Sequence, residues 1–184
     1  DRFHRAFWLK EGGGRPPIAV APEGVWSPIR CLRQAFPWAH MLPEDLDGDL
    51  CMTDYEFALE KRRVASDDWM PFSAPWRAVP WLEAMAGCSV RYAPGSVAPW
   101  QCAASAAELA QAPDPAGRGW FDCLRRQTDA LVDAAPEDCW VASVPFRGPS
   151  DALAAMRGLT AFYCDLRDAP EIVDTAAARL NRLL

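Results

Sequence analysis

The segment from residue 139 to residue 171 constrains the fold of this chain more than any other part of the sequence. It opens with an apolar run at 139–144, and Gly148 and the proline after it then break the chain. Asp151 is placed to cap a helix, because its side chain can accept hydrogen bonds from free N–H groups of the first turn. Asp168 is placed to cap a second helix, whose first turn holds a proline at no cost in hydrogen bonds. The segment therefore predicts a strand, a turn and two successive helices.

Two more strand-and-helix units precede this segment, so the prediction for the chain is an α/β layout. The expected strands cover 18–21, 69–72 and 139–144, and the expected helices cover 54–65, 80–86, 105–111 and 120–135. Residues 88–92 alternate like a short edge strand. The stripe expected to face the core from the helix at 120–135 consists of Phe121, Leu124, Thr128, Leu131 and Val132. Core or lid packing is expected for Trp8, Trp26, Trp38, Trp100, Trp120 and Trp140.

Charge and composition argue against several classes of partner. The formal net charge is −6, and the arginines are spread along the chain without a basic run. No nucleic-acid partner is therefore expected, because phosphate contacts need clustered cations. No membrane partner is expected either, because no apolar run approaches the roughly 20 residues that cross a bilayer. The seven cysteines form no C-x-x-C pair, and no signal peptide is seen, so we expect reduced thiols and a cytoplasmic location.

Several segments resemble one known family. Residues 148–158 read G-P-x-D-x-L-A-x-x-R-G, residues 165–171 read D-L-x-D-x-P-E, and residues 83–90 read E-A-x-x-G-C-x-V. Near the start, Arg5-Ala6-Phe7-Trp8 and the later run 15–20 look like an opening helix and a first barrel strand. In order and spacing these segments resemble the uroporphyrinogen decarboxylase superfamily. That superfamily includes the haem-pathway decarboxylase and the cobamide-dependent methyltransferases.

The fold that the resemblance implies is a (β/α)8 TIM barrel, which takes about 250 residues. The chain supplies about the first three β/α units, so residues 1–184 are expected to be the N-terminal portion of a single barrel domain. The second half would be absent, and the missing initiator methionine also predicts a longer reading frame. The alternative is a small three-strand α/β domain that is complete in itself.

In a parallel barrel the active site is built from the loops that follow the strands. Here those loops supply Glu23, Ser73, Trp76, Arg77 and Arg147 as candidate substrate-binding residues, and Asp151 as a candidate catalytic residue. The Arg147 guanidinium can bind a carboxylate through two parallel hydrogen bonds, or it can form a salt bridge with a neighbouring loop acid. Asp151 can serve as a general acid or base, or it can cap the helix.

His40 is a further candidate for substrate binding. It lies in a proline- and tryptophan-rich segment, 22–43, which is long for a loop and is expected to pack as a lid. A loop histidine without an acid or cysteine nearby is more often structural. The sequence contains no Ser-His-Asp order, no glycine-rich phosphate loop and no H-E-x-x-H pattern.

The chain departs from the decarboxylase pattern at two places. The family's F-S-D aspartate corresponds to Ala74 in this chain. The family's R-Q-A-G-R loop is matched only by Arg33-Gln34-Ala35, because Phe36-Pro37 replaces the glycine and the second arginine. The resemblance therefore implies a divergent member that transfers methyl groups of a small molecule, with a cobamide, a corrinoid protein as partner, and zinc ligands in the missing half. A first alternative is a true uroporphyrinogen decarboxylase that uses Arg33, Arg77 and Arg147. A second is a barrel that binds a small ligand without turnover. The fragment alone is expected to be inactive.

Overall fold

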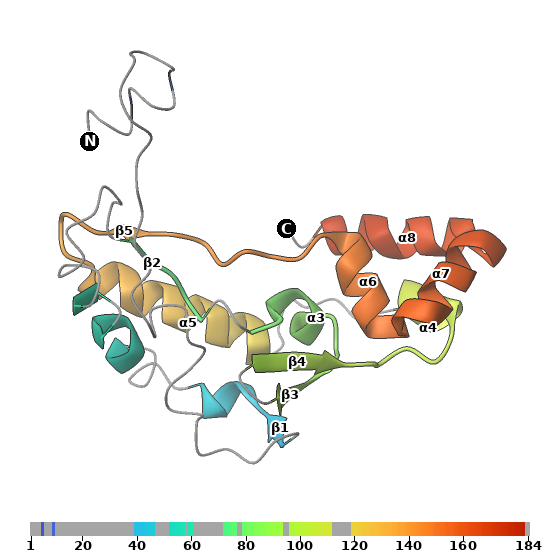
Figure 1. Cartoon of the computed structure of the whole chain (residues 1–184), viewed down its shortest axis with the longest axis horizontal. Helices are drawn as coiled ribbons and strands as arrows, with labels where there is room; N and C mark the ends of the chain where they lie inside the picture. Colours follow the sequence, from blue (N-terminus) through green and yellow to red (C-terminus); the bar gives the residue numbers. More distant parts are fainter. Residues whose placement is uncertain are drawn as a thin grey trace.

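The computed structural model of the protein describes a mixed arrangement of helices and short strands (Figure 1). The residues that it describes are 5, 9, 39–46, 52–57, 59–60, 72–76, 79–93, 96–111 and 119–182. The expected strand at 18–21 lies outside these residues. So do most of the segment expected as a lid and the residues of the R-Q-A-G-R comparison.

The helices carry most of the described chain. They are α3 (Trp81–Met85), α4 (Ala106–Ala110), α5 (Gly119–Ala134), α6 (Pro149–Arg157), α7 (Leu159–Asp168) and α8 (Pro170–Asn181), with a 3-10 turn η2 (Pro43–Asp45). Residues 52–57 and 59–60 are also helical. The predictions for α3, α4 and α5 are confirmed to within one residue at each end.

A three-stranded antiparallel sheet lies beside α3. Its strands are β1 (His40–Met41), β3 (Ser89–Ala93) and β4 (Ser96–Trp100), in the order β1-β3-β4. Ser89 pairs with Trp100 in the β3–β4 hairpin, and His40 pairs with Arg91 across β1 and β3. The strand expected at 88–92 was predicted as an edge strand, and this was wrong, because β1 covers its second side. That pairing joins segments 50 residues apart, which local alternation does not reveal.

A second, parallel pair consists of β2 (Phe72–Ser73) and β5 (Trp140–Val141). The Ala142 N–H extends it by donating to the Ser73 carbonyl oxygen at 2.7 Å. Parallel strands need a long crossover connection, and here α3, the hairpin, α4 and α5 lie between them. The pair fits an α/β layout, whereas the antiparallel sheet is not a feature of a parallel barrel. The barrel therefore stays a prediction.

Two helix starts differ from the sequence-based expectation. The residue that precedes α6 is Gly148, with Pro149 at the first helical position, so Asp151 lies inside the first turn and caps nothing. The residue that precedes α8 is Ala169, and Asp168 instead ends α7. Both predicted caps were wrong for one reason. Proline has a fixed φ and no N–H, so it takes the first helical position and the residue before it becomes the cap.

The buried face of α5 also differs from the predicted stripe. Leu131 is buried and Leu124 is partly buried against the core, as predicted, but Phe121 and Val132 are exposed, and the other buried residues are Cys123 and Gln127. Gln127 explains the difference, because its amide nitrogen donates to the Leu46 carbonyl oxygen and its amide oxygen accepts from the Trp76 N–H, both at 3.4 Å. A buried polar anchor of this kind does not appear in a pattern of apolar residues.

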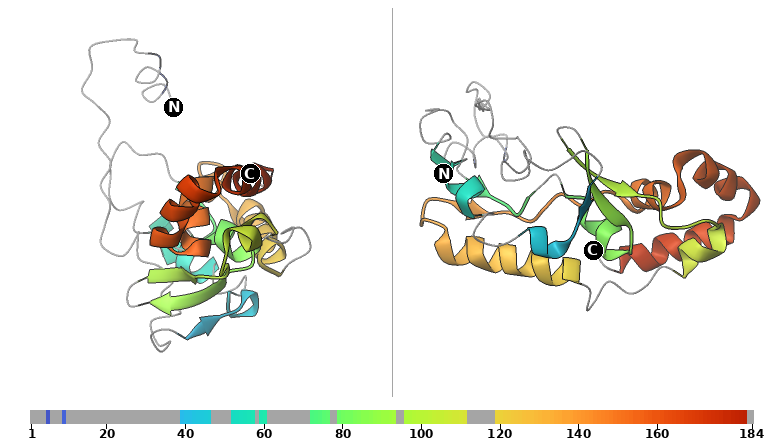
Figure 2. Two further views of the ribbon diagram at one scale, coloured as in Figure 1. Left: turned by 90° about the vertical axis from the view of Figure 1, so that its right-hand side faces the viewer. Right: turned by 90° about the horizontal axis from the view of Figure 1, so that it is seen from below.

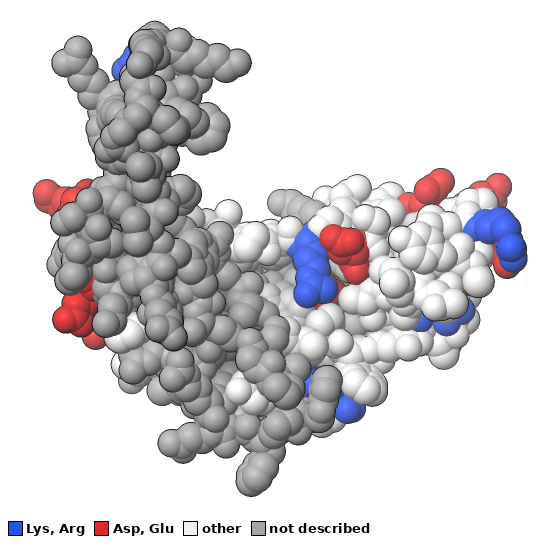
Figure 3. Space-filling view, in the orientation of Figure 1, with Lys and Arg blue, Asp and Glu red and all other residues white. Residues whose placement is uncertain are grey.

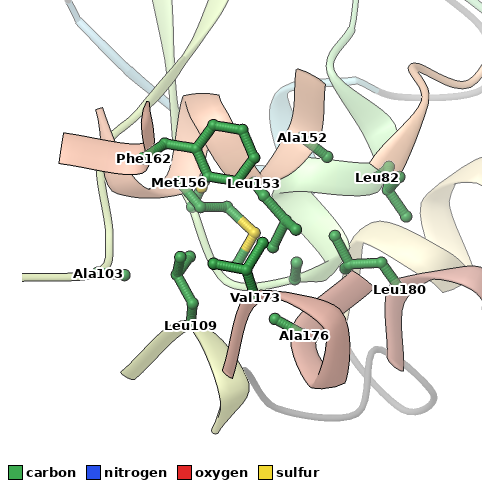
Figure 4. Close-up of a cluster of buried hydrophobic side chains, with 12 residues drawn as sticks. Leu82, Ala103, Leu109, Ala152, Leu153, Met156, Phe162, Val173, Ala176 and Leu180 are labelled. Atoms are coloured by element: carbon green, nitrogen blue, oxygen red, sulfur yellow. The ribbon is translucent and has the colours of Figure 1, made fainter. Parts of the chain in front are cut away.

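Two main clusters of buried side chains lie on either side of α3. One joins Trp76, Trp81, Met85, the antiparallel sheet and α5, and the other joins α3 to α4, α6, α7 and α8. In the second cluster, Leu153 and Met156 of α6 pack with Leu109, Val173 and Leu180 (Figure 4). Two perpendicular views place α5 at one end of the described chain and the group α4, α6, α7 and α8 at the other (Figure 2). The short helix α3 is thus the centre of the packing.

Candidate functional site

The most unusual side chain of the described residues is the carboxylate of Glu83. All five residues of α3 are buried, and the Glu83 side chain is only 1 % exposed. The helix packs against α5 and α6. Within the described part of the chain, neither carboxylate oxygen makes a hydrogen bond of good geometry to another residue, although an arginine lies close to one of them. Burying an ionised carboxylate without such partners is costly, so a group of this kind calls for a functional explanation.

Arg147 is the one cation that approaches Glu83 among the described residues. Its Nη1 lies 3.2 Å from Glu83 Oε1, while the Arg147 side chain itself remains half exposed. The two expectations for Arg147 were a substrate carboxylate or a neighbouring loop acid. The structure gives it an acidic partner, which lies on helix α3 rather than on a loop.

Asp151 lies close enough to Glu83 to act on it electrostatically, and it is exposed in the first turn of α6. Burial raises the pKa of the Glu83 carboxyl above its ordinary value of 4.5. The residue's own backbone amide and the Arg147 charge lower this pKa, whereas the negative charge of Asp151 raises it further. Because burial is the largest of these influences, Glu83 holds its proton more tightly than a surface glutamate does.

Ser73 is the last residue of β2, Trp76 follows three residues later, and both are buried. Ser73 Oγ and Trp76 Nε1 have no hydrogen-bond partner among the residues that the structure describes. In contrast, both backbone groups of Trp76 are hydrogen-bonded. The carbonyl oxygen accepts from Trp81 Nε1 at 2.9 Å, and the N–H donates to the Gln127 side chain. Residue 76 is thus fixed through its backbone, and its side chain packs in the core cluster that contains Trp81 and Met85.

The structure brings only some of the predicted site residues together. Arg147 and Asp151 meet at Glu83, and the register of the parallel pair places Ser73 beside the segment that leads to them. His40 lies on β1 rather than in a loop, and no hydrogen bond or ion pair of the described residues joins it to Glu83. Glu23 and Arg77 lie outside the described residues.

The sequence-based prediction missed Glu83. The residue was noticed only as a letter of the E-A-x-x-G-C-x-V pattern. A usable signal was present, because Glu83 is the single charged residue in the run 79–86, whose other members are apolar or proline. A lone acid in a helix that is apolar all round has to be buried.

The described surface is mostly uncharged on the face shown in Figure 3, where acidic and basic groups are scattered singly or in small groups. Within the described ranges, no group of three or more His, Cys, Asp or Glu side chains is placed to hold a metal ion. No helix in this part of the chain is long and apolar enough to cross a membrane. Comparisons with protein-family models, curated proteins and solved structures found no match to the chain.

Proposed function

We propose that the chain is part of a small-molecule enzyme of the uroporphyrinogen decarboxylase superfamily, and that its reaction is methyl transfer. The observation that carries the enzymatic part is the buried Glu83 carboxyl, with its raised pKa and with Arg147 and Asp151 beside it. Carboxyls whose pKa is perturbed by burial and by specific charged neighbours concentrate at catalytic sites. The resemblance supplies the superfamily and the reaction class.

Glu83 would act as the proton donor. A small molecule that loses a methyl group from oxygen, nitrogen or sulfur leaves an anion or a basic atom, which has to take up one proton. A carboxyl whose pKa is raised by burial holds its proton to higher pH than a surface acid, and it could deliver that proton directly to the atom that loses the methyl group. Arg147 would orient the substrate through the exposed part of its side chain and keep the Glu83 carboxylate in place after the proton has left.

The charge of the site favours methyl transfer over porphyrinogen decarboxylation. With Glu83 protonated, as the proposed proton transfer requires, the charges of Asp151 and Arg147 balance. A site with one arginine and no net positive charge offers little attraction to a substrate with many carboxylates, whereas it suits a neutral methylated molecule. Decarboxylation is the second candidate, and the half-exposed guanidinium of Arg147 favours it, because that group can bind one substrate carboxylate.

The cofactors implied by the resemblance are zinc and a cobamide carried by a corrinoid protein, which would supply the methyl acceptor. No cluster of the described residues fits zinc, so we assign no step of the reaction to it here. We place the reaction in the cytoplasm, since cysteines outside disulfides, such as Cys88, Cys102 and Cys164, suit a reducing compartment.

The test uses the protein expressed from its complete reading frame. Methanol, methylamines and methylthiols are offered with cob(I)alamin, and methyl transfer is followed by the loss of cob(I)alamin absorbance. We expect turnover with one class of donor, and Glu83→Gln should lower it by about 100-fold or more. Glu137→Gln is the matched control, because Glu137 is exposed, and it should leave turnover unchanged.

Uroporphyrinogen is offered to the same preparation, and its products are separated by chromatography. Decarboxylation without methyl transfer would replace the first proposal by the second. Tight binding of a donor without any turnover would instead support a binding protein. If Glu83→Gln turned over as fast as the wild type, Glu83 would not be the proton donor.

A further inference from the structure

Two thiols meet at the open end of the β3–β4 hairpin. Cys88 directly precedes β3, and Cys102 follows the end of β4 by two residues. Because Ser89 pairs with Trp100, the antiparallel register brings the residues just outside the hairpin close together. The two Sγ atoms lie 3.1 Å apart, and neither cysteine takes part in a disulfide.

The backbone on each side of this pair is anchored. The Cys88 N–H donates to the Glu83 carbonyl oxygen at 2.9 Å, which ties it to α3. The N–H groups of Cys102 and Ala103 both donate to the Met156 carbonyl oxygen at 2.9 Å, which ties them to α6. A disulfide bond is about 2.0 Å long, so the sulfur atoms have to approach by only about 1 Å. Side-chain rotation can supply this without moving either anchor.

We propose that Cys88 and Cys102 are a redox-sensitive modification site, at which a reversible disulfide forms across the end of the hairpin. Cys102 is exposed and Cys88 is buried, so an oxidant in solution reacts with Cys102 first. The proposal depends on the geometry of these two thiols alone. It therefore holds or fails independently of the proposed methyl transfer.

The oxidant would be a low-molecular-weight disulfide such as glutathione disulfide. The Cys102 thiolate attacks one sulfur of this reagent, a mixed disulfide forms, and the first reagent thiol leaves. Cys88 then gives up its proton and attacks Cys102 Sγ, and the second reagent thiol leaves. Two protein thiols are oxidised to one disulfide while one reagent disulfide is reduced to two thiols. Contact with the Cys102 thiol and burial raise the pKa of Cys88 above its usual range, so Cys88 acts second.

The experiment maps the bond directly. The full-length protein is first reduced, then equilibrated in glutathione buffers with a rising share of the disulfide form, and the remaining thiols are blocked with N-ethylmaleimide. Trypsin cuts after Arg77, Arg91 and Arg118, which places Cys88 in peptide 78–91 and Cys102 in peptide 92–118. Mass spectrometry without reduction should show these two peptides linked, and dithiothreitol should release them.

Cys164, which is exposed on α7, is the internal control and should gain at most a glutathione adduct. In Cys88→Ser, Cys102 should stop at the mixed disulfide. In Cys102→Ser, the loss of free Cys88 thiol should slow at least about tenfold. The proposal is overturned if wild-type Cys88 keeps its maleimide label at every buffer composition, or if it links mainly to another cysteine. The wild-type map decides the question even if a variant fails to fold.

Discussion

At the scale of single residues, three ion pairs of the described chain differ in how far their side chains are buried, and therefore in their effect on stability. Arg167 and Asp168 are largely exposed, and such pairs contribute little to stability. Arg157 and Asp165, at 2.7 Å and mostly buried, join α6 to α7. Glu83 differs from both, because the acid is buried while its arginine is half exposed. The hydration that its carboxylate loses on burial is therefore only partly compensated by Arg147, which is a cost to stability.

This cost predicts a pH dependence of stability. The pKa of Glu83 in the folded protein is raised above 4.5, so the folded state binds this proton more tightly than the unfolded chain. The resulting stabilisation is complete below pH 4.5 and is lost as the pH rises through the folded-state pKa. Glu83→Gln cannot ionise, so we expect its free energy of unfolding to exceed that of the wild type at about pH 8, with the gap closing towards about pH 5.

Urea unfolding of the two proteins across that pH range measures the gap. Glu137→Gln is again the control, because its carboxylate is exposed, and its difference from the wild type should stay flat. A Glu83→Gln variant that is less stable than the wild type at every pH would show that the carboxylate is fully satisfied in the folded state.

The two charged neighbours of Glu83 should move its pKa in opposite directions. Arg147→Gln removes the cation that lowers the pKa of Glu83, so this pKa should rise. Asp151→Asn removes the anion that raises it, so the pKa of Glu83 should fall. The Arg147 change should be the larger, because its guanidinium touches the carboxylate. An NMR titration of 13C-labelled glutamate carboxyls measures both, with the Glu83 signal assigned by its absence in Glu83→Gln. Shifts of the same sign would contradict the geometry of the site.

At the scale of elements, the sequence predicted what local chemistry controls. The bounds of α3, α4 and α5 follow from short-range apolar periodicity and helix-breaking residues, and they agree with the structure. The errors arise where one residue overrides a pattern. Pro149 and Pro170 each occupy the first position of a helix, so α6 and α8 start at other residues than predicted. The hydrogen-bonded amide of Gln127 is buried on the face of α5 that packs inward, where the apolar pattern predicted other residues. Trp140 and Trp100 were expected to pack inside, yet they are 65 % and 48 % exposed.

The link between α6 and α7 offers a sharp test at this scale. Gly158 has φ +87° and ψ 133°, a backbone region that is nearly restricted to glycine. A Cβ there would also lie 3.1 Å from Gln101 Oε1. Gly158→Ala should therefore lower the free energy of unfolding by about 1–3 kcal/mol, as measured by urea denaturation.

Gly148→Ala is the matched control for Gly158→Ala, because Gly148 has φ −62° and its added Cβ meets only Ser150 Oγ at 3.9 Å. That change should stay within about 0.5 kcal/mol of the wild type. Adding Gln101→Ala to Gly158→Ala removes the crowding but leaves the backbone strain, so most of the loss should remain. Full recovery in the double variant would mean that crowding alone is responsible.

At the scale of the whole molecule, the candidate site depends on contacts that no local pattern contains. Arg147 and Asp151 were predicted because they follow a strand, which is a local feature. Their meeting with Glu83 depends on α3 lying between α5 and α6, elements that are distant in the chain. The same holds for Cys88 and Cys102, which meet only through the register of the hairpin. The sequence therefore predicted the residues that follow a strand, Arg147 and Asp151. It did not predict Glu83 or the Cys88–Cys102 pair, which depend on contacts between distant elements.

The last prediction concerns the barrel. If the 184 residues are part of a larger barrel, the isolated chain should lack partners for its strands and apolar surface. The strands β2 and β5 are two residues long, and Trp140, Leu159 and Tyr163 are each more than 60 % exposed. We therefore expect the isolated chain to be poorly soluble, to bind a hydrophobic dye and to melt over a broad temperature range.

The protein from the complete reading frame should instead melt in one sharp transition, because long strand partners and a closed barrel make unfolding cooperative. Differential scanning calorimetry of both proteins at equal concentration makes the comparison, with the calorimetric and van't Hoff enthalpies as the measure of cooperativity. A sharp, reversible transition of the isolated chain with equal enthalpies would favour the small three-strand α/β domain. In that case the exposed side chains of β5 and α7 would belong to the finished surface of the fold, and the site at Glu83 would have to act with the residues of this chain alone.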